Sequence, residues 1–190
     1  MAEVLFFHHV LGRTAGFLAL ADAIREAGHT VHTPDMFGGV TFDSIEAGMD
    51  YSRTAGHDPV GVGLRAADDL PADLVYAGVS YGVMPAQRLA QTRPGARGAL
   101  LLEGAAPPDH FAPAWPADVP VQVHGMDEDP VFAGEGDVEF ARTIVAQANQ
   151  GELFLYPGNA HLFVDSGLPG HDAEATALAV KRMLDFLADR

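Results

Sequence analysis

The strongest constraint on the fold is the alternation of short apolar runs with amphipathic stretches along the whole chain. Runs of four to eight residues that are rich in Val, Leu or Phe and bounded by Gly, Pro or Asp are typical of strands buried on both faces. Six such runs occur, at residues 4–9, 30–34, 73–79, 98–104, 119–125 and 151–157.

Between these runs, apolar residues recur every three or four positions, as on one face of a helix. The pattern favours helices over 17–27, 82–93, 138–148 and 177–187, and Gly28 provides a natural end for the first. Asp43 is placed to cap a further helix, with Glu46 completing a capping pair. Alternating strands and helices predict an α/β fold, a mainly parallel sheet with helices on both faces. We expect a single domain over residues 1–190.

Composition excludes several classes of function. A formal net charge of -15 argues against a nucleic-acid partner and against an anionic membrane surface. The chain has no cysteine, which removes disulfides, thiolate metal sites and a cysteine nucleophile. No apolar run approaches the ~18 residues of a membrane span, and no basic leader opens the sequence, so a cytoplasmic location is predicted.

The stretch "YAGVSYGVMP" places Ser80 between Gly78 and Gly82 in a G-x-S-x-G pattern. An apolar strand precedes the serine and a helical pattern follows it, which is the context of a strained turn that exposes a nucleophilic hydroxyl. Glycines two positions away relieve crowding at such a turn. The backbone N–H of Tyr81 would then face a developing oxyanion at a helix N-terminus.

A serine nucleophile needs a base and an orienting acid, which follow later strands in the chain order Ser, Asp, His. Asp127 and Asp129 follow the fifth predicted strand, and His161 follows the sixth. Because the carboxyl ends of parallel strands collect at one edge of a sheet, we expect these groups to meet there. Asp129 is the favoured acid, because Pro130 fixes a turn beside it; Asp127 remains the alternative.

The motifs "FFHHVLG", "GVSYGVMPAQ", "HGMDEDPVF" and "YPGNAHLFVDS" together resemble the dienelactone hydrolase family of α/β-hydrolases over nearly the whole chain. No connection between the predicted elements is long enough to hold a cap domain, so we expect a compact fold. The resemblance implies a sheet of six strands in the order 2-1-3-4-5-6. It also implies an oxyanion hole made by the backbone N–H groups of Val10 and Tyr81.

The chain departs from the family pattern at three positions. Ser80 stands where the family has a cysteine, and His9 stands where the family has a glutamate that touches the nucleophile. Asp165 stands four residues after His161, where the family tends to place an arginine that holds a substrate carboxylate. An aspartate there would repel an anion, so the predicted substrate is a neutral ester, lactone or thioester.

Four further residues are candidates for the wall of the pocket: His9, Glu103, Trp115 and Phe132. His8 and His9 do not predict a metal site, because neighbouring strand residues point to opposite faces. The glycines of "GVGLRA" (61–66) follow a polar, proline-containing segment, which argues against a dinucleotide site.

The prediction is therefore a serine hydrolase that uses Ser80, His161 and Asp129, with no cofactor and a small-molecule ester as substrate. A non-catalytic ligand-binding member of the fold and an acyltransferase are the alternatives. The sequence leaves the oligomeric state open, with a homodimer among the candidates.

Overall fold

The computed structural model describes residues 1–190 and contains a six-stranded, entirely parallel sheet in the order β2-β1-β3-β4-β5-β6. The predicted fold class and strand order are confirmed. The strands are β1 (Glu3–Phe7), β2 (Thr30–His32), β3 (Val75–Val79), β4 (Gly98–Leu102), β5 (Val121–Met126) and β6 (Gly151–Tyr156).

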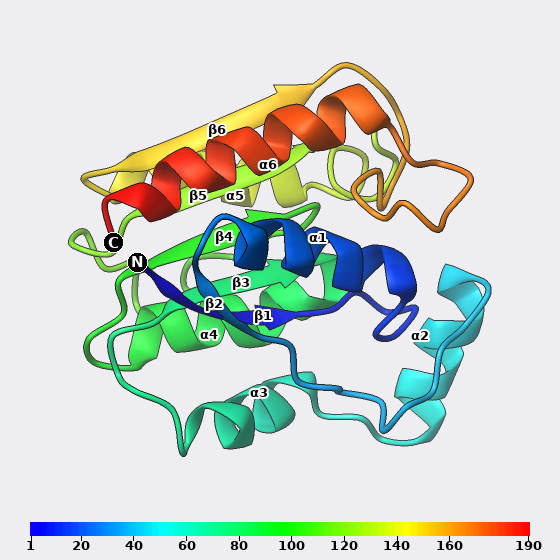
Figure 1. Ribbon diagram of the computed structural model, residues 1–190, viewed down its shortest axis with the longest axis horizontal. Helices are drawn as coiled ribbons and strands as arrows, with labels where there is room; N and C mark the ends of the chain where they lie inside the picture. Colours follow the sequence, from blue (N-terminus) through cyan, green and yellow to red (C-terminus); the bar gives the residue numbers. More distant parts are fainter.

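Helices cover both faces of the sheet (Figure 1). α1 (Ala15–Glu26) and α6 (Ala173–Ala188) pack on one face, while α4 (Val83–Thr92) and α5 (Asp137–Gln147) pack on the other. α3 (Pro59–Ala67) lies against α4, and α2 (Ile45–Thr54) stands at one end of the molecule (Figure 1). This arrangement leaves β3, β4 and β5 fully buried, as their apolar runs predict.

Two local predictions differ from the structure. α2 is capped by Ser44, whose side chain accepts a hydrogen bond from the Ala47 N–H, and not by Asp43. Both residue types cap helices well, so composition alone does not choose between neighbours.

The second difference is α3, which forms over the glycine-rich stretch that carried no helix prediction. Asp58 caps it, and Pro59 occupies its first turn. A Cβ at Gly63 would lie 2.3 Å from Pro85 Cβ of α4, so this glycine permits the close approach of the two helices.

Candidate active site

Ser80 occupies a sharp turn between β3 and α4. Its φ of 49° lies in the left-handed region, which is strained for a residue with a side chain. A Cβ at Gly78 would lie 2.1 Å from the Gly82 carbonyl oxygen, and one at Gly82 would lie 2.3 Å from the Phe7 carbonyl oxygen. Both glycines are therefore required by the turn and by its contact with the end of β1.

The turn brings Ser80 to His161, and His161 to Asp129. Ser80 Oγ lies 2.9 Å from His161 Nε2, and His161 Nδ1 lies 2.7 Å from Asp129 Oδ2. Asp129 is fully buried, and its Oδ1 accepts a hydrogen bond of 2.8 Å from the Val131 N–H. With Nδ1–H donated to the carboxylate, the lone pair of Nε2 is directed at the serine hydroxyl.

Asp127 has a different environment, although it too follows β5. Its exposed carboxylate accepts a hydrogen bond of 3.0 Å from the Gly158 N–H in the loop after β6. The side chain that hydrogen-bonds to His161 is thus that of Asp129, the aspartate before the proline.

The loop after β1 forms the opposite side of the site. Val10 is buried in the wall of the cavity beside Ser80 and Tyr81, and its N–H donates to no other protein group. α2 supports this loop closely, because a Cβ at Gly48 would lie 2.3 Å from the Val10 carbonyl oxygen. The Tyr81 hydroxyl lies 2.8 Å from Ser52 Oγ, which ties α2 to the serine turn.

These groups open into one cavity of about 500 Å³. Ten of its 18 lining residues are hydrophobic, and no lysine or arginine lines it. The carboxyl groups in its lining are those of Glu103, Glu135 and Asp137. Burial raises the pKa of the Asp137 carboxyl, although a hydrogen bond from the Ala105 N–H opposes the shift. The cavity therefore favours an apolar group without negative charge.

The sequence of residues 2–190 matches the profile of the dienelactone hydrolase family. The chain belongs to the dienelactone hydrolase family. Members of this family act on ester bonds, and this chain is a hydrolase of that kind. No curated protein sequence matches it.

Solved structures share the fold of this dienelactone hydrolase family member at low sequence identity. The dienelactone hydrolase-like promiscuous phosphotriesterase P91 from metagenomic libraries is 18% identical, with a TM-score of 0.77 over 100% of this chain and 86% of that one. The dienelactone hydrolase from Anabaena variabilis is 16% identical, with a TM-score of 0.69 over 100% and 86%. A cold-adapted esterase from an Arctic intertidal metagenomic library is 17% identical, with a TM-score of 0.64 over 98% and 82%.

Two of the three positions at which this chain departs from the family pattern lie in contact with one another. His9 Nε2 lies 2.8 Å from Asp165 Oδ2, and both side chains are buried. Asp165 also accepts hydrogen bonds from Thr14 Oγ1 and the Gly167 N–H. Burial raises the pKa of this carboxyl, but the hydrogen bonds outweigh burial and lower it overall. His9 thus turns away from the cavity and joins the loop after β1 to the loop that carries His161.

Of the other three residues predicted to line the pocket, the structure places only one in the cavity wall. Glu103 lines the cavity, but Trp115 and Phe132 do not. The Trp115 indole N–H donates to the Val119 carbonyl oxygen, so the ring packs its own loop onto the core. Phe132 is buried against Gly125 of β5, where a Cβ would lie 2.3 Å from the ring. Both aromatic rings anchor loops rather than face the substrate cavity.

Several lining residues carried no signal in the sequence. Ile45 and Met49 of α2, Met84 of α4, His110 and Phe140 all contribute to the cavity. His110 is the one residue of this group that the sequence could have suggested. It lies in the proline-rich segment after the fourth strand, and segments that follow strands lie near the carboxyl edge of the sheet.

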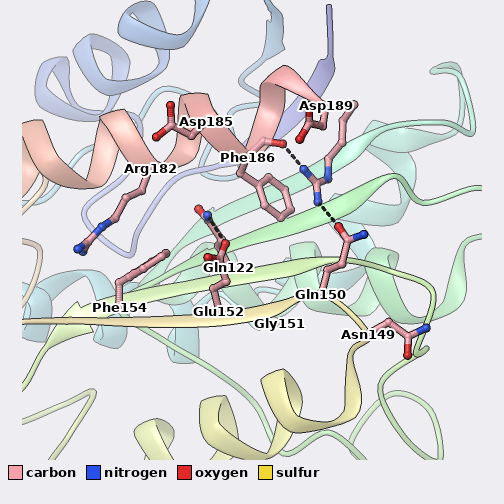
Figure 2. Close-up of a pocket in the computed structure, with 11 residues that line it drawn as sticks. Gln122, Asn149, Gln150, Gly151, Glu152, Phe154, Arg182, Asp185, Phe186 and Asp189 are labelled. Carbon is pink, nitrogen blue, oxygen red and sulfur yellow. Dashed lines mark hydrogen bonds between the residues drawn. The ribbon is translucent and has the colours of Figure 1, made fainter.

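A second depression lies at the opposite, amino edge of the sheet, between β6 and the end of α6 (Figure 2). Gln122 donates to Glu152, and Arg190 contacts Gln150, so these polar groups pair with one another (Figure 2). The depression has no nucleophile beside a base. No helix of the protein is long and apolar enough to cross a membrane, and no three His, Cys, Asp or Glu side chains are grouped to hold a metal ion.

Proposed function

We propose that this protein is a serine hydrolase that cleaves a small neutral ester, lactone or thioester through an acyl-enzyme on Ser80. The observation that carries the proposal is the hydrogen-bonded chain from Ser80 Oγ through His161 to buried Asp129, at the mouth of an apolar cavity.

In the first step, Ser80 Oγ attacks the carbonyl carbon while its proton passes to His161 Nε2. The backbone N–H groups of Val10 and Tyr81 stabilise the negative oxygen of the tetrahedral intermediate. Asp129 stabilises the imidazolium and holds its orientation. His161 then gives the proton to the departing alcohol or thiol, and the acyl group remains on Ser80.

In the second step, His161 Nε2 takes a proton from water as the water oxygen attacks the acyl carbon. The new intermediate collapses to the carboxylic acid, and the proton returns from His161 to Ser80 Oγ. The second step thus restores the hydroxyl of Ser80 and the neutral imidazole of His161.

The assignment of the acid gives a matched pair of variants, Asp129→Asn and Asp127→Asn. We expect Asp129→Asn to lower kcat on p-nitrophenyl butyrate by about 10³- to 10⁴-fold, because the amide favours the wrong tautomer of His161. Asp127→Asn should stay within about threefold of the wild type, because it alters one exposed loop contact.

The same steady-state assay tests the charge of the substrate. The anionic ester p-nitrophenyl hemisuccinate should show a kcat/KM at least about tenfold below that of the butyrate, because the cavity lining contains carboxyl groups and no lysine or arginine. Equal losses in the two aspartate variants would contradict the assignment of Asp129 as the acid. An absence of hydrolysis by the wild type would contradict the proposal as a whole and favour a non-catalytic member of the fold.

A further inference from the structure

Glu103 is a buried carboxyl group in the cavity wall that the steps above do not use. It follows β4 directly and is 1% exposed. Its φ of 58° is in the left-handed region, and its N–H donates to the His124 carbonyl oxygen at 2.6 Å. A long, ionisable side chain in a strained and buried position is unfavourable unless its contacts have a role.

The Glu103 side chain reaches from β4 to the turn that carries the histidine. Its Oε1 accepts a hydrogen bond of 2.7 Å from the Phe163 N–H, two residues beyond His161. The residue between them, Leu162, has a φ of 64°. A left-handed Leu is strained, so this turn needs contacts from outside to keep its shape. Glu103 supplies such a contact at the next residue.

The surroundings of Glu103 favour an uncharged carboxyl. Burial raises its pKa well above the usual value, and the negative charges of Asp129 and Asp165 raise it further, while the backbone N–H groups of Phe163 and Leu162 act in the opposite direction. Asp129 faces it from the loop after β5 and Asp165 from the loop after β6. Its Oε2 is buried and has no hydrogen-bond partner. A protonated carboxyl keeps Oε1 as an acceptor and adds no second charge near His161.

We propose that Glu103 is a positioning residue for His161, and that its Oε1 fixes the turn by accepting the hydrogen bond from the Phe163 N–H. The inference rests on the proposed function, because it assigns His161 as the base. It explains why an ionisable residue occupies the strained position after β4: the group holds the imidazole in line with Ser80 while Asp129 remains the carboxylate bound to the ring.

The test compares Glu103→Gln with Glu103→Met, which have similar volumes. The Gln side chain keeps an acceptor for the Phe163 N–H and is never charged, whereas the Met side chain fills the space without a comparable acceptor. We expect kcat on p-nitrophenyl butyrate, per active site titrated with a fluorophosphonate, to be at least about tenfold lower in Glu103→Met than in Glu103→Gln. KM should differ by less than about threefold, because Glu103 positions the base and not the ester.

Two further readouts separate positioning from a purely structural role. The histidine limb of the pH–kcat profile should coincide in the wild type and Glu103→Gln, because neither carries a charge at residue 103. The downfield proton resonance of the His161–Asp129 hydrogen bond should coincide in these two proteins and shift or broaden in Glu103→Met. If Glu103→Met does not fold, Glu103→Asp, whose carboxyl is one methylene too short to reach Phe163, should show the same loss of kcat.

Equal kcat per titrated site in Glu103→Gln and the variant without the contact would overturn the inference. A shifted histidine limb in Glu103→Gln would overturn the uncharged state. Failure of the proposed function has a different signature, since the wild type itself would then be neither titrated nor active.

Discussion

At the scale of the residue, the active site depends on a few atoms that have no room to move. Ser80 is held in a left-handed conformation, and the glycines on either side leave no space for a methyl group. This strain projects the hydroxyl toward His161, so the conformation of the turn and the chemistry of the site are linked.

Gly82→Ala tests this link. The φ of Gly82 is −69°, which alanine adopts freely, so the substitution adds only a Cβ that would lie 2.3 Å from the Phe7 carbonyl oxygen. We expect a loss of about 3 kcal/mol in the free energy of unfolding, measured in urea, with a fall in kcat. Gly104→Ala is the control for the unfolding measurement alone, because Gly104 lines the cavity and its Cβ would have nothing nearer than the Ser80 carbonyl oxygen at 3.3 Å. Equal stability of the two variants would show that the elbow tolerates the methyl group.

Residue by residue, the sequence was informative where a side chain follows a strand. The positions of Ser80, Asp129 and His161 follow from this rule, and the structure brings the three together. The rule does not say where a side chain turns. Trp115 and Phe132 lie on loops near the sheet edge, but local contacts with Val119 and Gly125 decide their orientation.

At the scale of the element, the site is assembled from loops that need to be held at fixed distances. The His9–Asp165 contact joins the loop after β1, which presents the Val10 N–H, to the loop after β6, which presents His161. α1 packs against the same contact, because a Cβ at Gly16 would overlap the Asp165 carboxylate. The contact therefore sets the spacing between the proposed oxyanion donor and the proposed base.

Asp165→Asn is expected to weaken both folding and catalysis. The Asp165 carboxylate is buried and accepts hydrogen bonds from three donors. Removing its charge should lower the free energy of unfolding of the protein by about 3 kcal/mol. We expect kcat to fall by about tenfold with little change in KM, since the loops and not the cavity are altered. Urea unfolding and initial rates measure the two effects, with Asp127→Asn as the exposed control. Wild-type values for both would contradict the role of this contact.

The sequence predicted the strands and most of the helices, but not one short helix or the contacts between distant loops. The apolar runs located all six strands. For β3, β4 and β5 the reason is burial on both faces, which leaves little room for polar residues. The edge strands β2 and β6 are partly exposed and were located by their Val, Leu and Phe content. α3 escaped prediction because glycines lower helix propensity, and propensity does not register the close packing of Gly63 against Pro85. The pairing of His9 with Asp165 could not be deduced, because 156 residues separate them.

At the scale of the whole molecule, buried histidines connect stability to pH. Burial lowers the pKa of His8 to about 4 and that of His124 to about 3. As the pH falls below 6.5, the unfolded chain binds protons at these imidazoles that the folded chain does not. Stability is therefore lost as the pH falls through this window, by about 2 kcal/mol per histidine between pH 7 and pH 5.

Two buried carboxyl groups, those of Glu103 and Asp165, have opposite effects on stability as the pH falls. Glu103 has a raised pKa, so the folded state binds its proton first and gains stability as the pH falls. Asp165 has a lowered pKa, so its stabilising effect is lost only below the usual carboxyl range.

Replacing one buried histidine should make the free energy of unfolding depend less on pH. His124→Gln retains a side chain that can hydrogen-bond to Tyr156 and cannot titrate, so its free energy of unfolding should change about 2 kcal/mol less than that of the wild type between pH 7 and pH 5. His171→Gln, in the loop before α6, is the control. Urea unfolding at each pH measures the difference, and parallel curves for His124→Gln and the wild type would contradict the assignment.

Covalent labelling of the intact protein by a fluorophosphonate, followed by mass spectrometry, tests Ser80 as the nucleophile without any assumption about the substrate. We expect one adduct per chain, located on Ser80 and absent in Ser80→Ala. The adduct should form at least about 10³-fold more slowly in His161→Ala, because phosphonylation needs the serine and its base. An unlabelled wild-type protein, or an adduct on another residue, would contradict the assignment of Ser80 as the nucleophile.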